Sequence, residues 1–345
     1  MASRVAVSGA GSWGTTVAAM TSRNVPTVLW ARRKELADEI ATDHQSRAYL
    51  PDVQLPAALE GTSSLEEAVT GADVIVLGVP SHGMRAVLAE AAPYVTAGVP
   101  VVSLTKGVEQ GTLKRMTEVV QEMLPGHPAG VLTGPNLAKE VMAGYPAASV
   151  VAIEDDGLAR QLQRIFGTEW FRVYTNPDVI GCEVAGALKN VMAIAAGMVD
   201  GMGFGDNTKA ALMTRGLAEL ARLGVALGGR PLTFSGLAGM GDLIATCSSR
   251  QSRNRFVGEQ LAIGRTLDQI VADMSMVAEG VKSSRAVVDL AARVGVEMPI
   301  AEQVVATLYD GRPAGDTIAA LMGRESKSEL HGIEGAKATP LRAEE

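Results

Sequence analysis

Residues 5–14 have the sequence VAVSGAGSWG, in which a short apolar run is followed at once by three glycines, Gly9, Gly11 and Gly14. In a G-x-G-x-x-G turn the first glycine permits a tight bend and the second lets the backbone approach a pyrophosphate. The third lets the next helix pack against the strand. The N–H groups and positive dipole at the start of that helix bind phosphate. Between a strand and a helix, this spacing predicts a dinucleotide-binding site.

Short β-branched runs alternate with helix-like stretches from Arg4 to about Tyr174, as in consecutive βαβ units. Most of these runs are apolar throughout, which is typical of parallel strands covered on both faces. The predicted strands are residues 5–7, 25–30, 74–79, 99–104, 131–133 and 148–152. We therefore predict an α/β fold with an N-terminal Rossmann-like doubly wound sheet, over residues 1–176.

The sequence pattern becomes helical after Asn176-Pro177. One helix is predicted over residues 207–227, because Gly228-Gly229 and Pro231 supply signals that end helices. We predict an all-helical substrate and catalytic domain over residues 177–330 and a flexible polar tail over residues 331–345. A chain of 345 residues is long enough for two domains.

Composition and charge narrow the possible partners. Hydrophobic residues make up 47% of the chain and the net charge is −7, with no long run of Lys or Arg. Such a charge disfavours nucleic acid and anionic membrane surfaces as partners. Cys182 and Cys247 lack the spacing of metal ligands and suit a reducing compartment, so no metal site is expected. Without a signal peptide pattern or a long apolar run, we expect a cytoplasmic protein without membrane insertion.

The end of the second predicted strand bears on the choice of dinucleotide. A site for NAD usually has Asp or Glu about 20 residues after the turn, to bind the ribose 2′-hydroxyl. Here Arg32 and Arg33 occupy that position. Guanidinium groups bind phosphate in a bidentate manner, which favours NADPH over NADH. Alternatively, both arginines are solvated residues at the start of a helix.

Five further motifs follow the glycine turn in a fixed order. They are Pro80-Ser81-His82, Thr105-Lys106-Gly107, Gly134-Pro135-Asn136-Leu137-Ala138-Lys139-Glu140, Lys189-Asn190 and Gln251-Ser252-Arg253-Asn254-Arg255. Together they resemble the NAD(P)-dependent glycerol-3-phosphate dehydrogenases of bacterial type, over residues 4 to about 325. The resemblance implies reduction of dihydroxyacetone phosphate to sn-glycerol 3-phosphate for phospholipid synthesis, with NADPH or NADH as cofactor. It also makes a homodimer possible.

Lys189 is the candidate catalytic residue. It lies in residues 180–199, which are so apolar that Glu183, Lys189 and Asn190 are the main polar members. A helix that is apolar all round is normally buried. The resemblance implies that Lys189 donates a proton to the oxygen of the ketone. The alternative is a structural lysine that is paired with a carboxylate or reaches solvent with its charged end.

Arg253 is the candidate phosphate ligand, since an acidic protein needs a dedicated cation to bind a phosphate dianion. A guanidinium matches phosphate oxygens, and Ser252 and Asn254 beside it add hydrogen-bond donors. The alternative is a solvated basic loop, because Arg250 and Arg255 flank this segment.

Other positions keep two interpretations each. Asp242 either caps a helix or binds substrate or Lys189. Asn136 stands where the family commonly has Ser or Thr, and either contacts substrate or caps a helix. Glu279 would pass as an exposed helix residue, but the resemblance places it at the cofactor. His82 is given a structural or cofactor-lining role, because the family uses lysine as the proton donor.

The resemblance implies two sets of site residues. The predicted substrate-binding residues are Lys106, Gly134, Asn136, Lys189, Asn190, Asp242, Thr246, Ser252, Arg253 and Asn254. The predicted cofactor-binding residues are Gly9, Gly11, Ser12, Trp13, Gly14, Arg32, Arg33, Lys106, Ala138, Arg253, Val277 and Glu279. Two other functions remain open: a dehydrogenase of 3-hydroxy acids or sugar-acid phosphates, and a non-catalytic redox sensor that binds NADPH.

Overall fold

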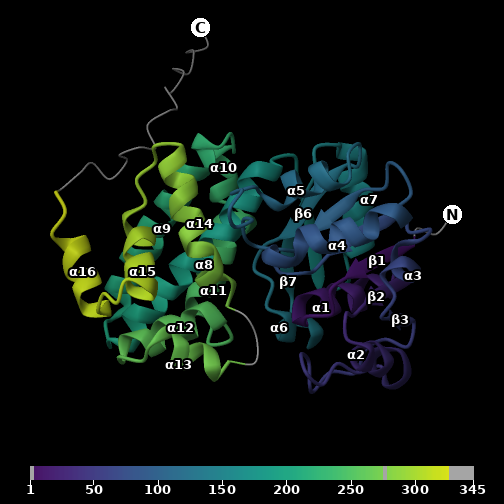
Figure 1. Ribbon diagram of the computed structural model, residues 1–345, viewed down its shortest axis with the longest axis horizontal. Coiled ribbons are helices and arrows are strands. Elements are labelled where there is room, and N and C mark those ends of the chain that lie inside the picture. The colour runs from purple at the N-terminus through teal and green to yellow at the C-terminus, as the bar shows by residue number, and fades with distance from the viewer. Residues whose placement is uncertain (1–3, 275–277, 326–345) are drawn as a thin grey trace, which may run out of the picture.

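The computed structural model describes residues 4–274 and 278–325. The chain forms two halves: a sheet covered by helices up to Asn176, and an array of helices after it (Figure 1). The predicted tail over residues 331–345 and the predicted cofactor residue Val277 lie outside the described residues.

The sheet has eight strands in the order β3-β2-β1-β4-β5-β6-β7-β8. The strands are β1 (Val5–Ser8), β2 (Thr27–Trp30), β3 (Leu59–Thr62), β4 (Val74–Leu77), β5 (Val101–Ser103), β6 (Ala129–Thr133), β7 (Ala147–Ala152) and β8 (Phe171–Asn176). All neighbours are parallel except β6 and β7. The first six strands have the 3-2-1-4-5-6 order of a Rossmann fold, which confirms the predicted fold class. The order reverses beside β1, where such sheets bind ligands.

Strands β3 and β8 were not predicted from the sequence. Strand β7 was expected to be parallel to its neighbours, but it is antiparallel to β6. In β3 only Leu59 and Thr62 are buried, because the strand lies at the edge of the sheet. At the other edge, β8 alternates buried Phe171 and Val173 with exposed Arg172 and Tyr174. Edge strands that are solvated on one side lack the continuous apolar run of a central parallel strand.

Helices cover both faces of the sheet. One apolar core lies under α1, α2, α6 and α7, and the other under α3, α4 and α5. These helices are α1 (Ser12–Thr21), α2 (Lys34–Asp38), α3 (Leu65–Val69), α4 (Met84–Ala91), α5 (Met116–Met123), α6 (Ala138–Met142) and α7 (Asp156–Phe166). Three short helical segments, η1 (Glu39–Asp43), η2 (Ser81–Gly83) and η3 (Ala92–Tyr94), lie between them.

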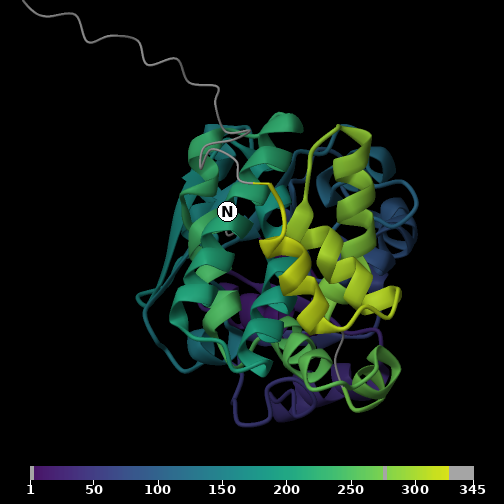
Figure 2. The same cartoon turned by 90° about the vertical axis from the view of Figure 1, so that its left-hand side faces the viewer.

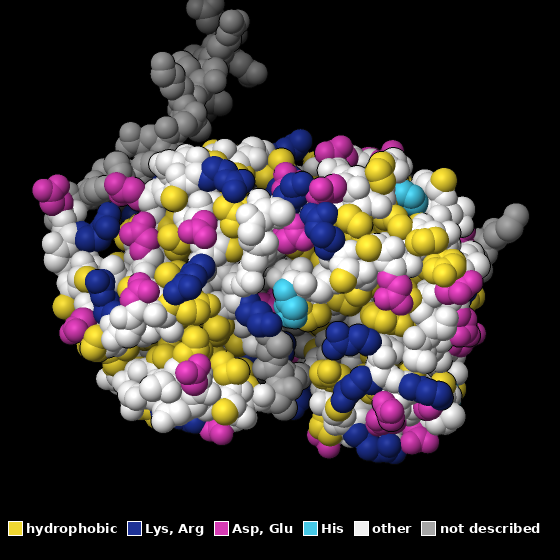
Figure 3. Space-filling view, in the orientation of Figure 1, with side chains coloured by type: hydrophobic (Ala, Val, Ile, Leu, Met, Phe, Trp, Pro, Cys, Tyr) yellow, Lys and Arg dark blue, Asp and Glu magenta, His cyan; other side chains and the backbone are white. Residues whose placement is uncertain are grey.

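The other half is helical throughout its described residues. Its elements are α8 (Val179–Gly201), α9 (Asp206–Ala226), α10 (Pro231–Phe234), η4 (Leu237–Gly241), α11 (Asp242–Ser248), α12 (Arg253–Ala262), α13 (Leu267–Ala272), α14 (Glu279–Arg293), α15 (Pro299–Tyr309) and α16 (Ala314–Met322). The predicted helix over residues 207–227 is α9, shifted by one residue. Figure 2 shows this half facing the viewer, with the C-terminal helices packed beside the earlier ones. The two halves meet along a central groove in the space-filling view (Figure 3).

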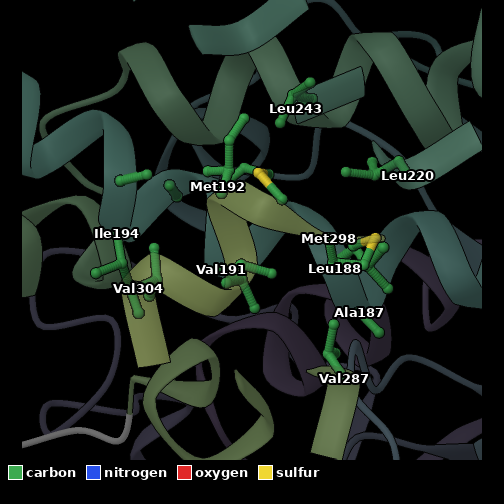
Figure 4. Packing of buried hydrophobic residues seen from close by; sticks show 14 of the residues in the cluster. Ala187, Leu188, Val191, Met192, Ile194, Leu220, Leu243, Val287, Met298 and Val304 are labelled. Atoms are coloured by element: carbon green, nitrogen blue, oxygen red, sulfur yellow. The ribbon is translucent and has the colours of Figure 1, made fainter. Parts of the chain in front are cut away.

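Helix α8 is the centre of the helical half. It packs against α9, α11, α12, α14 and α15, and Leu188, Val191 and Met192 are part of a buried apolar cluster (Figure 4). Helix α12 crosses α8 in backbone contact, since a Cβ on Gly197 would come within 1.9 Å of the Arg255 carbonyl oxygen. By length and apolar composition α8 could span a membrane, but 94% of its most apolar window is buried in the protein. Its apolar surface is therefore used by the core.

A buried ion pair joins the two halves. The Glu183 carboxylate of α8 lies 2.5 Å from Nη1 of Arg115, which precedes α5. The same carboxylate accepts hydrogen bonds from the Thr117 backbone N–H at 2.8 Å and the Thr117 hydroxyl at 2.5 Å. Burial raises the pKa of Glu183, and Arg115 and Thr117 oppose that rise.

Candidate active site

The glycine turn after β1 requires its glycines. Gly9 has a φ of 124°, and a Cβ there would come within 2.6 Å of the Gly78 backbone. A Cβ on Gly14 would come within 2.0 Å of the Gly9 carbonyl oxygen, so α1 approaches the turn closely. A Cβ on Gly11 would meet nothing within 4 Å, and Gly11 caps α1 without a side-chain hydrogen bond. The backbone N–H groups at the start of α1 therefore face open space, as phosphate binding requires.

Ser12 and Trp13 begin α1 but have different surroundings. The Trp13 ring is partly buried and packs against the core, with its centroid 6.0 Å from that of Phe171. The Ser12 hydroxyl donates a hydrogen bond to the Tyr49 carbonyl oxygen at 3.2 Å.

Two lysines, one from each half, share a buried carboxylate. Asp242 is 1% exposed and lies 2.6 Å from Nζ of Lys106 and 2.5 Å from Nζ of Lys189. Lys106 also donates to the Gly134 carbonyl oxygen at 2.9 Å, and Lys189 to the Thr246 hydroxyl at 2.7 Å. Each ammonium has three donors, so each keeps one N–H beyond these two bonds. Burial lowers the pKa of Lys106 to about 8, although the Asp242 carboxylate opposes that effect.

Asp242 does not cap a helix, which corrects one of its two interpretations. The cap of α11 is Gly241, and Asp242 is the first residue of the helix. Gly186 of α8 lies against the Lys106 side chain. A Cβ there would lie 3.4 Å from Cγ of Lys106 and 3.3 Å from the Thr133 hydroxyl. The glycine therefore lets Lys106 pass close to α8.

A chain of amide hydrogen bonds holds Asn190 and Asn254. The Gly280 backbone N–H donates to Oδ1 of Asn254 at 3.0 Å, and Nδ2 of Asn254 donates to Oδ1 of Asn190 at 3.0 Å. Nδ2 of Asn190 then donates to the Lys106 carbonyl oxygen at 3.1 Å. Because the two ends are a backbone donor and a backbone acceptor, both amide orientations are fixed. These residues, predicted to bind substrate, connect α8, α12, α14 and the loop after β5.

Asn136 has unused hydrogen-bonding groups. The alternative that it caps α6 is wrong, because the cap is Leu137, with no side-chain bond. Both polar atoms of the Asn136 side chain are buried without a hydrogen-bond partner, as is the nearby Thr133 hydroxyl. Buried polar atoms without partners are costly, so this pattern indicates a site that a polar ligand completes.

Arg253 lies at the start of α12, behind the cap residue Ser252. The Ser252 hydroxyl accepts a hydrogen bond from the Arg255 N–H at 3.3 Å, so this predicted substrate ligand also caps α12. The Arg253 side chain reaches solvent, yet burial lowers its pKa, as expected for a residue in a recess. Burial raises the pKa of Glu279, and the charges of Arg253, Lys106 and Lys189 oppose the rise. These charged groups therefore lie within electrostatic reach of Glu279.

Arg32 and Arg33 are exposed just after β2. The Arg33 guanidinium lies 5.9 Å from the centre of the Tyr49 ring. Tyr49 also lies within electrostatic reach of Arg253. Tyr49 was not among the predicted site residues, because it belongs to an irregular segment without a motif. The sequence analysis also missed Thr133, although a polar residue at the carboxyl end of β6 was a usable signal.

Two family models match this chain in succession. Residues 4–159 match the N-terminus of NAD-dependent glycerol-3-phosphate dehydrogenase, and residues 178–319 match its C-terminus. The chain belongs to the NAD-dependent glycerol-3-phosphate dehydrogenase family. Lys106 therefore comes from the family's N-terminal part, whereas Lys189, Asp242 and Arg253 come from its C-terminal part.

Full-length relatives support the same family. The chain is 56% identical over 328 residues to glycerol-3-phosphate dehydrogenase (NAD(P)+) 2 of Sphingopyxis alaskensis, covering 95% of this chain and 98% of the relative. It is 50% identical to glycerol-3-phosphate dehydrogenase (NAD(P)+) 1 of Mycobacterium tuberculosis, covering 95% and 97%. The crystal structure of glycerol-3-phosphate dehydrogenase from Coxiella burnetii is 34% identical, with a TM-score of 0.90 and coverage of 94% and 99%.

The residues of the turn fit the dinucleotide that the family name implies. The open space at Gly11 and the start of α1, which lacks a side-chain cap, would accept a pyrophosphate. Exposed Arg32 and Arg33 stand where the ribose of the adenosine part lies in such folds. Ala138, the first residue of α6, follows Asn136 by two positions and so lies near its buried unpartnered amide.

Proposed function

We propose that this chain reduces dihydroxyacetone phosphate to sn-glycerol 3-phosphate, with NADPH as the favoured cofactor and Lys189 as the proton donor. The observation that carries the proposal is the carboxylate of Asp242 held between Lys106 and Lys189. It concentrates two cations at one buried place in a protein of net charge −7. A phosphorylated ketone is a substrate that such charges bind and activate.

The nicotinamide, when bound, supplies the hydride. Gly9, Gly11 and Gly14 shape the turn that holds the dinucleotide, and Ser12 and Trp13 contribute backbone N–H groups there. Lys106 and Glu279 are further contacts proposed for the cofactor. Arg32 and Arg33 favour NADPH, because among the described residues neither has a carboxylate within ion-pair distance.

Lys189 acts where charge develops during the reduction. Addition of hydride to the carbonyl carbon leaves negative charge on the oxygen, and a proton must reach that oxygen. The ammonium of Lys189 is fixed by Asp242 at 2.5 Å and Thr246 at 2.7 Å, which leaves one N–H for the substrate. Asp242 is thus a positioning residue that holds two ammonium groups in place. Lys106 stabilises the same developing charge.

The rest of the substrate meets the remaining polar groups. Arg253 binds the phosphate, with help from the start of α12 behind it. The unpartnered amide of Asn136 and hydroxyl of Thr133 bind the hydroxyl and carbonyl groups of the carbon chain. The product serves phospholipid synthesis in the cytoplasm, and a homodimer is the proposed assembly.

The decisive experiment follows the loss of NADPH absorbance with dihydroxyacetone phosphate for the wild type, Lys189→Ala and Lys114→Ala. Lys114 is a surface lysine that pairs with Glu122, so its removal is the matched control. We expect Lys189→Ala to lower kcat by about 10²–10⁴ while NADPH still binds. No turnover by the wild type would reject the activity. Full turnover by Lys189→Ala would reject only the role of the lysine.

A further inference from the structure

Lys282 brings a positive charge from the helical half to the sheet half. It lies on the first turn of α14 and is exposed. Its carbonyl oxygen accepts a hydrogen bond from Nε2 of Gln110 at 2.7 Å, which anchors this turn on the loop after β5. A Cβ on Gly107 would lie 3.2 Å from the Ser81 hydroxyl and 4.0 Å from Cβ of Ser283. Helix α14 therefore begins beside Ser81 and its neighbour His82.

His82 and Arg32 stand on opposite sides of the glycine turn. Strand β1 is hydrogen-bonded to β2 on one side and to β4 on the other. Arg32 follows β2, and His82 follows β4 in η2. Strands in a sheet are about 4.8 Å apart, so the ends of β2 and β4 are separated by roughly 10 Å. A phosphate group at the turn would lie within reach of long side chains from both.

Three basic side chains thus share one region at the groove. Burial lowers the pKa of His82, and the charges of Lys282 and Arg32 lower it further, so His82 lies within electrostatic reach of both. A histidine and several Lys or Arg side chains gather beside the groove in the space-filling view (Figure 3). Among residues 4–274 and 278–325, no carboxylate forms an ion pair with Arg32, His82 or Lys282.

Two cations, Lys282 and Arg32, that disfavour the charge of a neighbouring imidazole and have no carboxylate partner indicate an anionic ligand, whose charge would favour the protonated imidazole. We propose that Lys282, together with Arg32 and His82, binds the 2′-phosphate of NADPH and so makes the helical half a determinant of coenzyme choice. This inference rests on the dinucleotide site of the proposed function. The pyrophosphate is a less suitable ligand, because the start of α1 already offers it backbone donors. Arg32 instead stands at the end of β2, where the 2′ position of the ribose is recognised.

Coenzyme binding at Lys282 would also affect the substrate site. Lys282 and Glu279 lie three residues apart on α14, and Glu279 faces Arg253, Lys106 and Lys189. A phosphate bound by Lys282 would therefore hold the first turn of α14 against the sheet half. Because Glu279 belongs to the same turn, coenzyme binding would also fix the wall of the substrate site.

The test measures coenzyme binding by the full-length protein without substrate. Nicotinamide fluorescence gives the Kd of NADPH and NADH for the wild type, Lys282→Met, Lys282→Arg and Arg293→Met. Arg293 ends α14 and is exposed, so Arg293→Met removes one charge from the same helix as a control. We expect Lys282→Met to weaken NADPH about tenfold and NADH less than twofold, and Lys282→Arg to restore most of the loss. Competition by 2′,5′-ADP against 5′-AMP should show the same difference.

Three results would overturn the inference. Equal weakening of NADPH and NADH would place Lys282 at the pyrophosphate, and no weakening would remove it from the site. An equal effect of Arg293→Met would show that the weaker binding of NADPH comes only from the lower net charge. These outcomes are independent of turnover, so an enzyme inactive on dihydroxyacetone phosphate can still give the expected binding result.

Discussion

Lys106 combines burial with a charge that the substrate needs. Its side chain is 14% exposed, and burial lowers its pKa to about 8. A substrate phosphate or developing alkoxide binds the charged ammonium and not the neutral amine. Lys106 therefore makes substrate binding sensitive to pH in a range where ordinary lysines remain charged.

The KM for dihydroxyacetone phosphate should rise as the pH increases from 7 to 9, about tenfold per unit above the pKa of Lys106. Lys106→Arg should remove this rise, because guanidinium stays protonated over the whole range. Initial rates across this range, at saturating NADPH, measure the effect. A lowered lysine pKa adds to the free energy of unfolding as pH increases from 8 to 10.5, so Lys106 itself does not cause unfolding there. A KM independent of pH would contradict this role of Lys106.

Residue types were predictable from the sequence, but several of their partners were not. The motifs placed Lys106, Lys189, Asp242 and Arg253 among the candidate site residues. Nothing in the spacing shows that Lys106 and Lys189 bind the same carboxylate, because 83 residues separate them in the chain. Ser252 was predicted to bind substrate, and its side chain also caps α12. Asn136 was predicted either to contact substrate or to cap a helix, but it does not cap α6. Cap geometry depends on backbone dihedral angles, which residue type only biases.

Among the strands, only those buried on both faces could be predicted from their apolar sequences. Central strands such as β1 and β4 are fully buried and therefore apolar throughout. The edge strands β3 and β8 carry exposed residues and escaped prediction. The direction of β7 was also unpredictable, since antiparallel pairing with β6 depends on the path of the intervening α6.

The amide chain through Asn254 connects four elements and should not tolerate a carboxylate. Asn254→Asp keeps an acceptor for the Gly280 N–H but places a second oxygen against Oδ1 of Asn190. Rotation of the Asn190 amide would relieve this contact only by turning its oxygen toward the Lys106 carbonyl. A buried polar group without a partner costs about 1–3 kcal/mol. We expect Asn254→Asp to lower the Tm by several degrees and to lower kcat, because the Lys106 loop shifts.

The control is Asn207→Asp, the same chemical change at an exposed position on α9. Thermal unfolding and steady-state kinetics of both variants separate the local effect from the added negative charge. If Asn254→Asp raised only the KM and left the Tm unchanged, Asn254 would be a direct substrate ligand, as the sequence analysis supposed.

For the whole molecule, the site depends on how two halves are held together. Lys106 and Asn136 come from the sheet half, and Lys189, Asp242 and Arg253 from the helical half. The family motifs indicated both halves but gave no contact between them. The buried pair of Arg115 and Glu183 is such a contact, and it lies outside every motif.

This pair should couple the stability of the halves far more than a surface pair does. Glu183→Ala leaves the partly buried Arg115 with only the exposed carboxylate of Glu118, 3.2 Å away, and removes the acceptor of the Thr117 N–H. Breaking a buried pair in this way costs about 3–5 kcal/mol. Because Arg115→Ala also removes the charge that has lost its buried partner, the double variant should be less destabilised than the sum of the single variants, by more than about 1 kcal/mol. Urea unfolding of the four proteins measures this coupling.

The exposed pair of Lys34 and Asp38, at 2.7 Å on α2, is the matched control, with side chains 73% and 59% exposed. Its coupling should be below about 1 kcal/mol, because water screens both charges. If Arg115 and Glu183 coupled no more strongly than this pair, apolar packing of α8 and the other polar contacts, such as that of Lys106 with Asp242, would hold the halves together. If they couple strongly, Glu183→Ala should also separate unfolding into two transitions, since the sheet half then loses a buried polar contact with α8.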